Sequence, residues 1–278
     1  MSIVYYYCNI DTYRSMLKSK TLWLTNLTES NDSQEVKRLY ENIWCFIQGY
    51  LINSDLDKEL VKNTIDNLES TFAIQKAVDI PFGCCFCIEP DLINLWNEYG
   101  DEGKGVCLGF DLDWFPIKKQ QPITSTNLDQ SIGYEKVLYD SVEVRSSLAD
   151  ICYKVIRENG VTAWINGILS TFKHYASFIK NPTFKGEEEV RIVYYPYDKF
   201  DVAPKEIGLS DLCNDIKPHY SLSWCNTDSV ALKRIIVGPE CKYSEQEIGK
   251  MLEEFSIKPS ENEVITISKS LSSYRKRS

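Results

Sequence analysis

The sequence predicts an α+β fold in a single domain that spans residues 1–278. Short β-branched and aromatic runs, typical of buried strands, alternate with longer segments in which apolar residues recur every three or four positions, as in amphipathic helices. With 278 residues and 43% hydrophobic content, the chain can bury one large core or two modest ones. No internal repeat and no Pro/Gly/Ser-rich linker marks a domain boundary. We therefore expect one mixed sheet flanked by helices.

The N-terminal region is expected to begin as strand, helix, strand and then to become helical. Its order is a strand at 3–7, a short helix capped by Asp11, a strand at 22–25, a polar loop at 26–34, and helices from residue 35 and over 57–72. The first of these two helices has apolar residues at spacings of three and four. We expect a helical insertion over about 33–75.

The remainder repeats the alternation of strands and helices. Strands are expected at 82–88, 106–110, 134–138 (hairpin-like), 190–195, 219–223, 234–237 and 264–267, with a helix at 92–99 and a helical segment over about 141–180. Ser244 and Glu247 form a capping box that predicts one more helix.

The charge of the chain bears on partners and location. A net charge of −9 and a pI near 5.0 disfavour attraction of the whole surface to nucleic acid or to anionic membranes. The basic run at 275–277 is expected to be a solvated tail. No signal peptide and no apolar stretch of membrane-spanning length is visible, so we expect a cytoplasmic protein without a membrane partner.

Ten cysteines are expected to be reduced, because the chain is long and has no secretory signal. Cys84, Cys85 and Cys87 lie in a predicted strand, where adjacent side chains point to opposite faces. Only His174 and His219 are present, so no tetrahedral metal site is expected. His174 lies on an apolar helix, and we interpret it as structural.

A glycine-rich segment follows the helix that ends with Trp96 and Tyr99. Gly103, Gly105 and Gly109 surround the start of a predicted strand. The helix precedes the glycines, whereas a phosphate-binding loop leads into one. In isolation the segment predicts a turn.

Taken along the whole chain, such motifs resemble a bacterial family defined as domain of unknown function 2971. The matching pieces, in order, are Tyr5-Tyr6-Tyr7, Leu22 to Asn26, Asn31-Asp32, Cys85 to Glu89, Trp96 with Tyr99, Lys180, Glu187 to Arg191, and Ile235 to Pro239. Two positions depart from the family pattern: Tyr6 replaces a usual His, and Val190 replaces a usual Trp.

The opening strand and the late Glu-x-Glu also resemble ADP-ribosyltransferase domains. This resemblance implies an ADP-ribosyltransferase-like sheet, either continuous or split, and NAD as substrate. It assigns catalytic roles to Glu189, Glu187 and Tyr99, and NAD-binding roles to Tyr6, Tyr7, Thr25, Asn26 and Trp96. The expected activity is ADP-ribosyl transfer or NAD hydrolysis by a toxin or anti-phage defence effector. Its acceptor would be a protein or nucleic acid, and an antitoxin or regulatory protein would be a partner.

The chemistry explains the choice of Glu189. Cleavage of the nicotinamide glycosidic bond builds positive charge on the ribose, and a fixed carboxylate stabilises that charge. Glu187 would orient the acceptor, and Tyr99 or Trp96 would pack on the nicotinamide ring. An exposed or cleft-facing Glu189 would contribute little to stability, so Glu189→Gln is expected to abolish turnover without unfolding the protein.

Other interpretations stay open. Residues 187–189 are also consistent with a solvated acidic turn in which Glu189 pairs with Arg191. The tyrosines at 5–7 are also common in half-buried strands. The alternative function is a non-catalytic binding or regulatory protein on the same scaffold, which the absence of a His at Tyr6 favours. A nuclease is a weaker third possibility, because no metal-binding cluster is evident.

Overall fold

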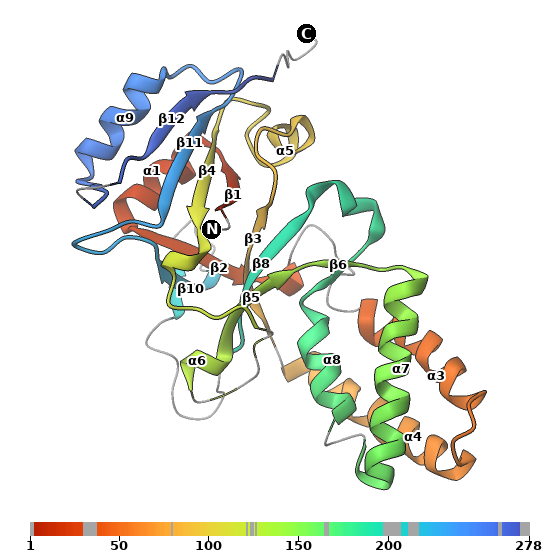
Figure 1. Ribbon diagram of the computed structural model, residues 1–278. Coiled ribbons are helices and arrows are strands. Elements are labelled where there is room, and N and C mark those ends of the chain that lie inside the picture. Colours follow the sequence, from red (N-terminus) through yellow and green to blue (C-terminus); the bar gives the residue numbers. More distant parts are fainter. Residues whose placement is uncertain are drawn as a thin grey trace.

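A computed structural model places residues 3–29, 38–78, 80–120, 122, 125, 127–163, 167–196, 207–210, 217–260 and 263–272 (Figure 1). The described strands are β1 (Ile3–Cys8), β2 (Thr21–Asn26), β3 (Phe82–Cys87), β4 (Val106–Asp111), β5 (Ile132–Lys136), β6 (Leu138–Tyr139), β7 (Ile179–Lys180), β8 (Glu189–Tyr194), β9 (Ile207–Ser210), β10 (Lys217–Ser223), β11 (Leu232–Val237) and β12 (Thr266–Lys269). The described helices are α1 (Ile10–Ser19), α3 (Trp44–Ile52), α4 (Lys58–Val78), α5 (Ile93–Glu98), α6 (Leu128–Ser131), α7 (Val142–Asn159), α8 (Leu169–Ala176) and α9 (Glu245–Glu254).

Ten of the described strands form one mixed sheet. Its main path runs β12-β11-β4-β1-β3-β2-β10-β9, and β8 joins β3 to β5 beside that path. Strands β11 and β12 are parallel, whereas the other pairs in the sheet are antiparallel. The predicted α+β class with a mixed sheet and flanking helices is therefore confirmed.

The sheet divides at β3. One edge of β3 pairs with β8 along its whole length, from Phe82 to Cys87. The other edge is shared, because Cys87 pairs with Tyr5 of β1 whereas Phe82 and Gly83 pair with β2. Between these contacts, in the described part of the chain, Cys84–Phe86 pair only with β8. Strands β1 and β2 thus diverge and leave an opening in the sheet.

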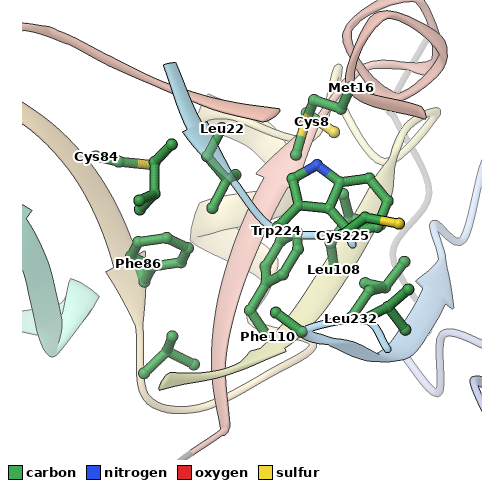
Figure 2. Packing of buried hydrophobic residues seen from close by; sticks show 14 of the residues in the cluster. Cys8, Met16, Leu22, Cys84, Phe86, Leu108, Phe110, Trp224, Cys225 and Leu232 are labelled. Atoms are coloured by element: carbon green, nitrogen blue, oxygen red, sulfur yellow. The ribbon is translucent and has the colours of Figure 1, made fainter. Parts of the chain in front are cut away.

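The larger core lies between the sheet and helices α1 and α9. Residues from β1 to β4 and from β11 meet there around the fully buried Trp224. Figure 2 shows Trp224 next to Phe110, Leu108 and Met16, and the Phe110 and Trp224 ring centroids are 5.9 Å apart. Burial of such large side chains contributes roughly 1.5–3 kcal/mol each, so this core holds β1 and β2 in place on either side of the opening.

A second core lies among α3, α4, α7 and α8, named here the helical cluster. The helices pack together to one side of the sheet (Figure 1). Trp44, Phe72 and Phe172 fill their centre, with the Phe72 and Phe172 rings stacked at 4.7 Å. The amphipathic spacing that predicted helices in both halves of the chain is explained by this shared core.

Several predicted boundaries were wrong. Asn9 caps α1, since its side chain accepts the Thr12 N–H, and Asp11 lies in the first turn. The expected hairpin strand at 134–138 is two strands, β5 and β6, which pair with β8 and β7. The predicted helical segment over about 141–180 ends earlier, with α8 at Ala176, and is followed by β7, because Ile179 and Lys180 pair with β6 instead. Strand β9 was not predicted, and β12 begins two residues later than expected.

Candidate functional site

A cavity of about 660 Å³ lies at the opening in the sheet. Its wall is built from β1, α1, β2, β3, the end of α5, and residues between Lys180 and Arg191. All the site residues predicted from the sequence line it except Trp96: Glu189, Glu187, Tyr99, Tyr6, Tyr7, Thr25 and Asn26. The volume is in the range of small-molecule sites. The fold thus brings together residues that are far apart in the sequence.

The opening in the sheet explains how side chains from both faces of the sheet line one cavity. Tyr5 and Tyr7 pack with residues of α5 on one face, whereas Tyr6 lies on the other, with its ring 6.0 Å from that of Phe86. This alternation follows from extended backbone. Because β1 and β2 diverge at β3, the cavity reaches Tyr6 as well as the opposite face, where Glu189 lies.

Trp96 has a supporting position behind the cavity wall. Its side chain is fully buried, and its indole Nε1–H donates to Asp91 Oδ1 at 2.7 Å. Its ring meets Tyr7 edge-on at 4.9 Å, and the Tyr7 hydroxyl accepts the Leu92 N–H at 2.8 Å. The predicted contact between Trp96 and a ligand is therefore corrected: Trp96 fixes Tyr7 and has no surface in the cavity.

Thr25 and Asn26 lie at the end of β2. Thr25 is exposed and pairs with Gly83. Asn26 Oδ1 accepts the Thr28 N–H at 2.9 Å, and Asn26 Nδ2 donates to Glu29 at 3.1 Å, so this side chain organises the turn after the strand. The Asn31-Asp32 pair, the basic run at 275–277 and the His174 side chain lie outside the part of the chain that the structure describes.

Four buried charges line one side of the cavity, and we name them the ionic cluster: Lys180, Glu187, Glu189 and Arg191. The Lys180 ammonium donates to Glu187 Oε2 at 2.6 Å and to Glu189 Oε2 at 2.9 Å. Arg191 Nε–H donates to Glu189 Oε1 at 2.6 Å. The cluster holds two positive and two negative charges, as buried ionised groups require.

Local sequence explains how the cluster forms. Asn181 caps a 3-10 turn over Pro182–Glu187, and Glu188 then takes a left-handed conformation with φ 43°. This reversal exposes Glu188 and leaves both neighbouring glutamates buried against Lys180. The solvated acidic turn is therefore excluded for Glu187 and Glu189, although the pairing of Glu189 with Arg191 is present.

The two carboxylates differ in their surroundings. Glu189 is 3% exposed; burial by itself would raise its pKa, but Arg191 and Lys180 outweigh burial and lower it to about 2. Glu187 shares Lys180, and its Oε1 accepts from the Tyr99 hydroxyl at 3.1 Å. Burial is the largest effect on Glu187 and raises its pKa despite Lys180. Glu187 is thus the carboxylate closer to exchanging a proton at physiological pH.

Sequence reasoning gave no role to Lys180. The residue lies seven positions before Glu187, and only the return of β7 beside β6 brings its ammonium to both glutamates. Its ammonium also lies 4.7 Å from the ring centroid of Phe184. Two signals for a role of Lys180 were available in the sequence. Lys180 is part of the family pattern, and the apolar strand around Glu189 indicates a buried carboxylate, which requires a cation nearby.

Cys85 and Cys84 point to opposite sides of β3, as predicted. Cys84 is buried, whereas Cys85 is exposed and lines the cavity. A hydrogen bond from the Cys85 thiol helps to lower the pKa of Glu189. Among the residues with assigned positions, no group of His, Cys, Asp and Glu is arranged to hold a metal ion, and no helix has the length and apolar character needed to cross a membrane.

Part of the chain is similar to a known protein family. No curated protein and no solved structure matches the chain. Residues 95–192 match the model of the family described as "Protein of unknown function (DUF2971)". This range begins in α5, contains the whole ionic cluster and ends in β8. The resemblance to this family is confirmed over residues 95–192, which hold the motifs from Trp96 and Tyr99 to the Glu-x-Glu strand, whereas the motifs before residue 95 and after residue 192 lie outside the matched range.

Proposed function

We propose that the cavity binds NAD and that the protein is an ADP-ribosyltransferase or NAD hydrolase. The observation that carries the proposal is the meeting of the N-terminal tyrosine strand and the Glu-x-Glu in one cavity at an opening in the sheet. Ligand sites gather at such junctions between elements.

The lining suits a ligand with flat rings and hydroxyl-bearing sugars. Tyr99 and Trp23 offer aromatic surface for a base or nicotinamide ring. Asn9, which caps α1, and Thr12 and Ser15 of α1 offer neutral donors and acceptors for ribose and phosphate oxygens. The ionic cluster lies beside Tyr99, which would place the scissile bond near the two carboxylates.

In this proposal Glu189 is the fixed anion and Glu187 the group that handles the proton. Glu189 stays ionised across the physiological range, because its pKa is lowered to about 2. A fixed carboxylate stabilises an oxocarbenium-like ribose. Glu187 has a raised pKa and a hydrogen bond to Tyr99, which suits a base toward water or an acceptor hydroxyl.

A second candidate is the non-catalytic binding protein. The observation that favours it is the use of both Glu189 oxygens, one by Lys180 and one by Arg191. A carboxylate bound in this way can be a structural member of the sheet. Ligand binding without turnover would then be the function of the cavity.

The test measures nicotinamide release from NAD by the wild type, by Glu187→Gln and by Glu188→Gln. Glu188 is exposed and next in sequence, so its variant is the matched control. The proposal expects wild-type and control turnover, with a loss on the order of a hundredfold in Glu187→Gln. Biotin-labelled NAD with cell lysate distinguishes transfer to protein, transfer to nucleic acid and hydrolysis alone. Protection of Cys85 from alkylation by NAD without any turnover would support the binding protein.

A further inference from the structure

We propose that Lys180 is a positioning residue that keeps Glu187 ionised and directed at the cavity, so that Glu187 serves as the base. The role as base rests on the proposed NAD chemistry; the control of ionisation does not.

Lys180 is held firmly by its own backbone. It ends β7, which pairs with β6, and its carbonyl accepts the Asp140 N–H at 3.0 Å. The side chain is 8% exposed. The ammonium stays beside its two carboxylates, because moving away from them would leave a buried charge without a partner and would cost its full desolvation energy.

The two glutamates depend on Lys180 to different extents. Glu189 retains Arg191 if Lys180 is removed. Among the described residues, the hydrogen-bond partners of Glu187 are the Lys180 ammonium and the neutral Tyr99 hydroxyl. Removal of the ammonium would therefore leave Glu187 buried without a cation, and such a carboxyl takes up a proton.

The titratable groups that interact with Glu187 in the described part of the chain are consistent with this assignment. They are Cys87 of β3, Tyr99 after α5, Tyr139 of β6, Lys180 of β7 and Glu189 of β8. Lys180 is the cation among these groups, whereas Glu189 opposes ionisation of Glu187. The charge on Lys180 is thus what offsets the burial of Glu187.

The step that Glu187 would assist is balanced as follows. A lone pair on the oxygen of water or of an acceptor hydroxyl forms a bond to the ribose carbon. The bond from that carbon to the nicotinamide nitrogen breaks, and its electron pair leaves with neutral nicotinamide. The proton of the attacking O–H moves to Glu187, which later releases it to solvent. A protonated Glu187 could not accept it.

The experiment compares four proteins between about pH 5 and 9 by thermal unfolding: wild type, Lys180→Met, Lys180→Met/Glu187→Gln and Lys180→Arg. In Lys180→Met the pKa of Glu187 in the folded state would lie further above its unfolded value. Folding then keeps a proton that the unfolded chain loses, so stability falls as the pH rises through that interval. We expect the melting temperature of Lys180→Met to match that of the double variant near pH 5 and to fall below it with increasing pH.

Lys180→Arg retains the charge, so its melting temperature should follow the wild-type pH dependence whatever constant offset its larger side chain causes. Failure of Lys180→Met to fold at neutral pH while the double variant folds would also support the proposal. Equal pH dependence in Lys180→Met and the double variant would overturn it, as would an Arg variant that behaves like the Met variant.

Nicotinamide release over the same pH range supplies the second measurement. The acid limb of the Lys180→Met profile should move upward by about one pH unit or more relative to wild type, with activity partly recovered at high pH. A uniform loss at every pH would assign Lys180 a merely structural role and overturn the proposal. Absence of turnover in the wild type would instead defeat the NAD proposal, and the unfolding data would still decide the ionisation of Glu187.

Discussion

Replacement of Glu189 by Gln is expected to destabilise the protein strongly. The carboxylate bridges Lys180 and Arg191, whose side chains are 8% and 0% exposed. Breaking a buried ion pair from one side costs about 3–5 kcal/mol. The fall of the Glu189 pKa from 4.5 to about 2 corresponds to about 3 kcal/mol, so both routes agree in size. The expectation of unchanged stability, made from the sequence, is corrected by this burial.

Thermal unfolding at neutral pH measures the effect. For a chain of this length about 2 °C is lost per kcal/mol, which gives a decrease of about 6–10 °C for Glu189→Gln. Glu188→Gln, at an exposed position, should remain within about 1 °C of wild type. A Glu189→Gln protein that melts within about 2 °C of wild type would refute the reasoning.

The contribution of Glu189 to stability is expected to depend on pH in the acid range. Its folded pKa is lowered, so its contribution is present above the unfolded value of 4.5 and disappears as the pH falls toward about 2. The difference in melting temperature between wild type and Glu189→Gln should shrink over this interval. A difference in melting temperature that stays constant with pH would mean that the destabilisation arises from packing and not from the charge of Glu189.

Two further predictions concern the cavity wall and the residues that support it from behind. In the native protein, brief alkylation with mass-spectrometric mapping should modify the exposed Cys45 and Cys85 and spare the buried Cys8 and Cys84. NAD should protect Cys85, which lines the cavity, and leave Cys45 reactive. Equal protection of Cys45 and Cys85 would place NAD elsewhere or indicate a general change in the reactivity of the protein. Asp91→Ala should release the segment at Leu271, whose N–H donates to Asp91 at 2.7 Å. It should also lower the free energy of unfolding by about 1–3 kcal/mol, because the buried Trp96 Nε1–H loses its acceptor. Hydrogen exchange at 266–271 that equals the wild type would contradict this prediction.

The sequence predicted secondary structure best where one local pattern determines it. The capping box of Ser244 and Glu247 is present, with both of its hydrogen bonds, at the start of α9. Strands β3, β4 and β8 lie close to their predicted positions, because runs such as residues 106–110 are apolar on both faces. Short strands were predicted poorly: β6 and β7 exist only through their pairing with each other, which no local pattern encodes.

The candidate site was also predicted only in part. Tyr6, Tyr99 and Glu189 were chosen for their residue types and motif positions, and they line one cavity. Burial was misjudged for Glu189, and so was the position of Trp96, because the number of atoms that cover a side chain depends on long-range packing. Lys180 was named as part of the family pattern, but its contacts with the two glutamates were not predicted, since they depend on the path of the chain between two strands.

The helical cluster is assembled from two stretches of chain, residues 38–78 and 142–176, with β3, β4 and β5 of the sheet between them. No single excision can therefore remove the helical cluster without also removing these three strands. Only Ser177–Ile179 separate the end of α8 from Lys180, and Arg191 donates to the Ser177 carbonyl at 2.7 Å. Unfolding of the helical cluster would therefore also displace Lys180, and the buried carboxylates of Glu187 and Glu189 would lose their shared cation. Despite its two cores, the protein should unfold as one cooperative unit.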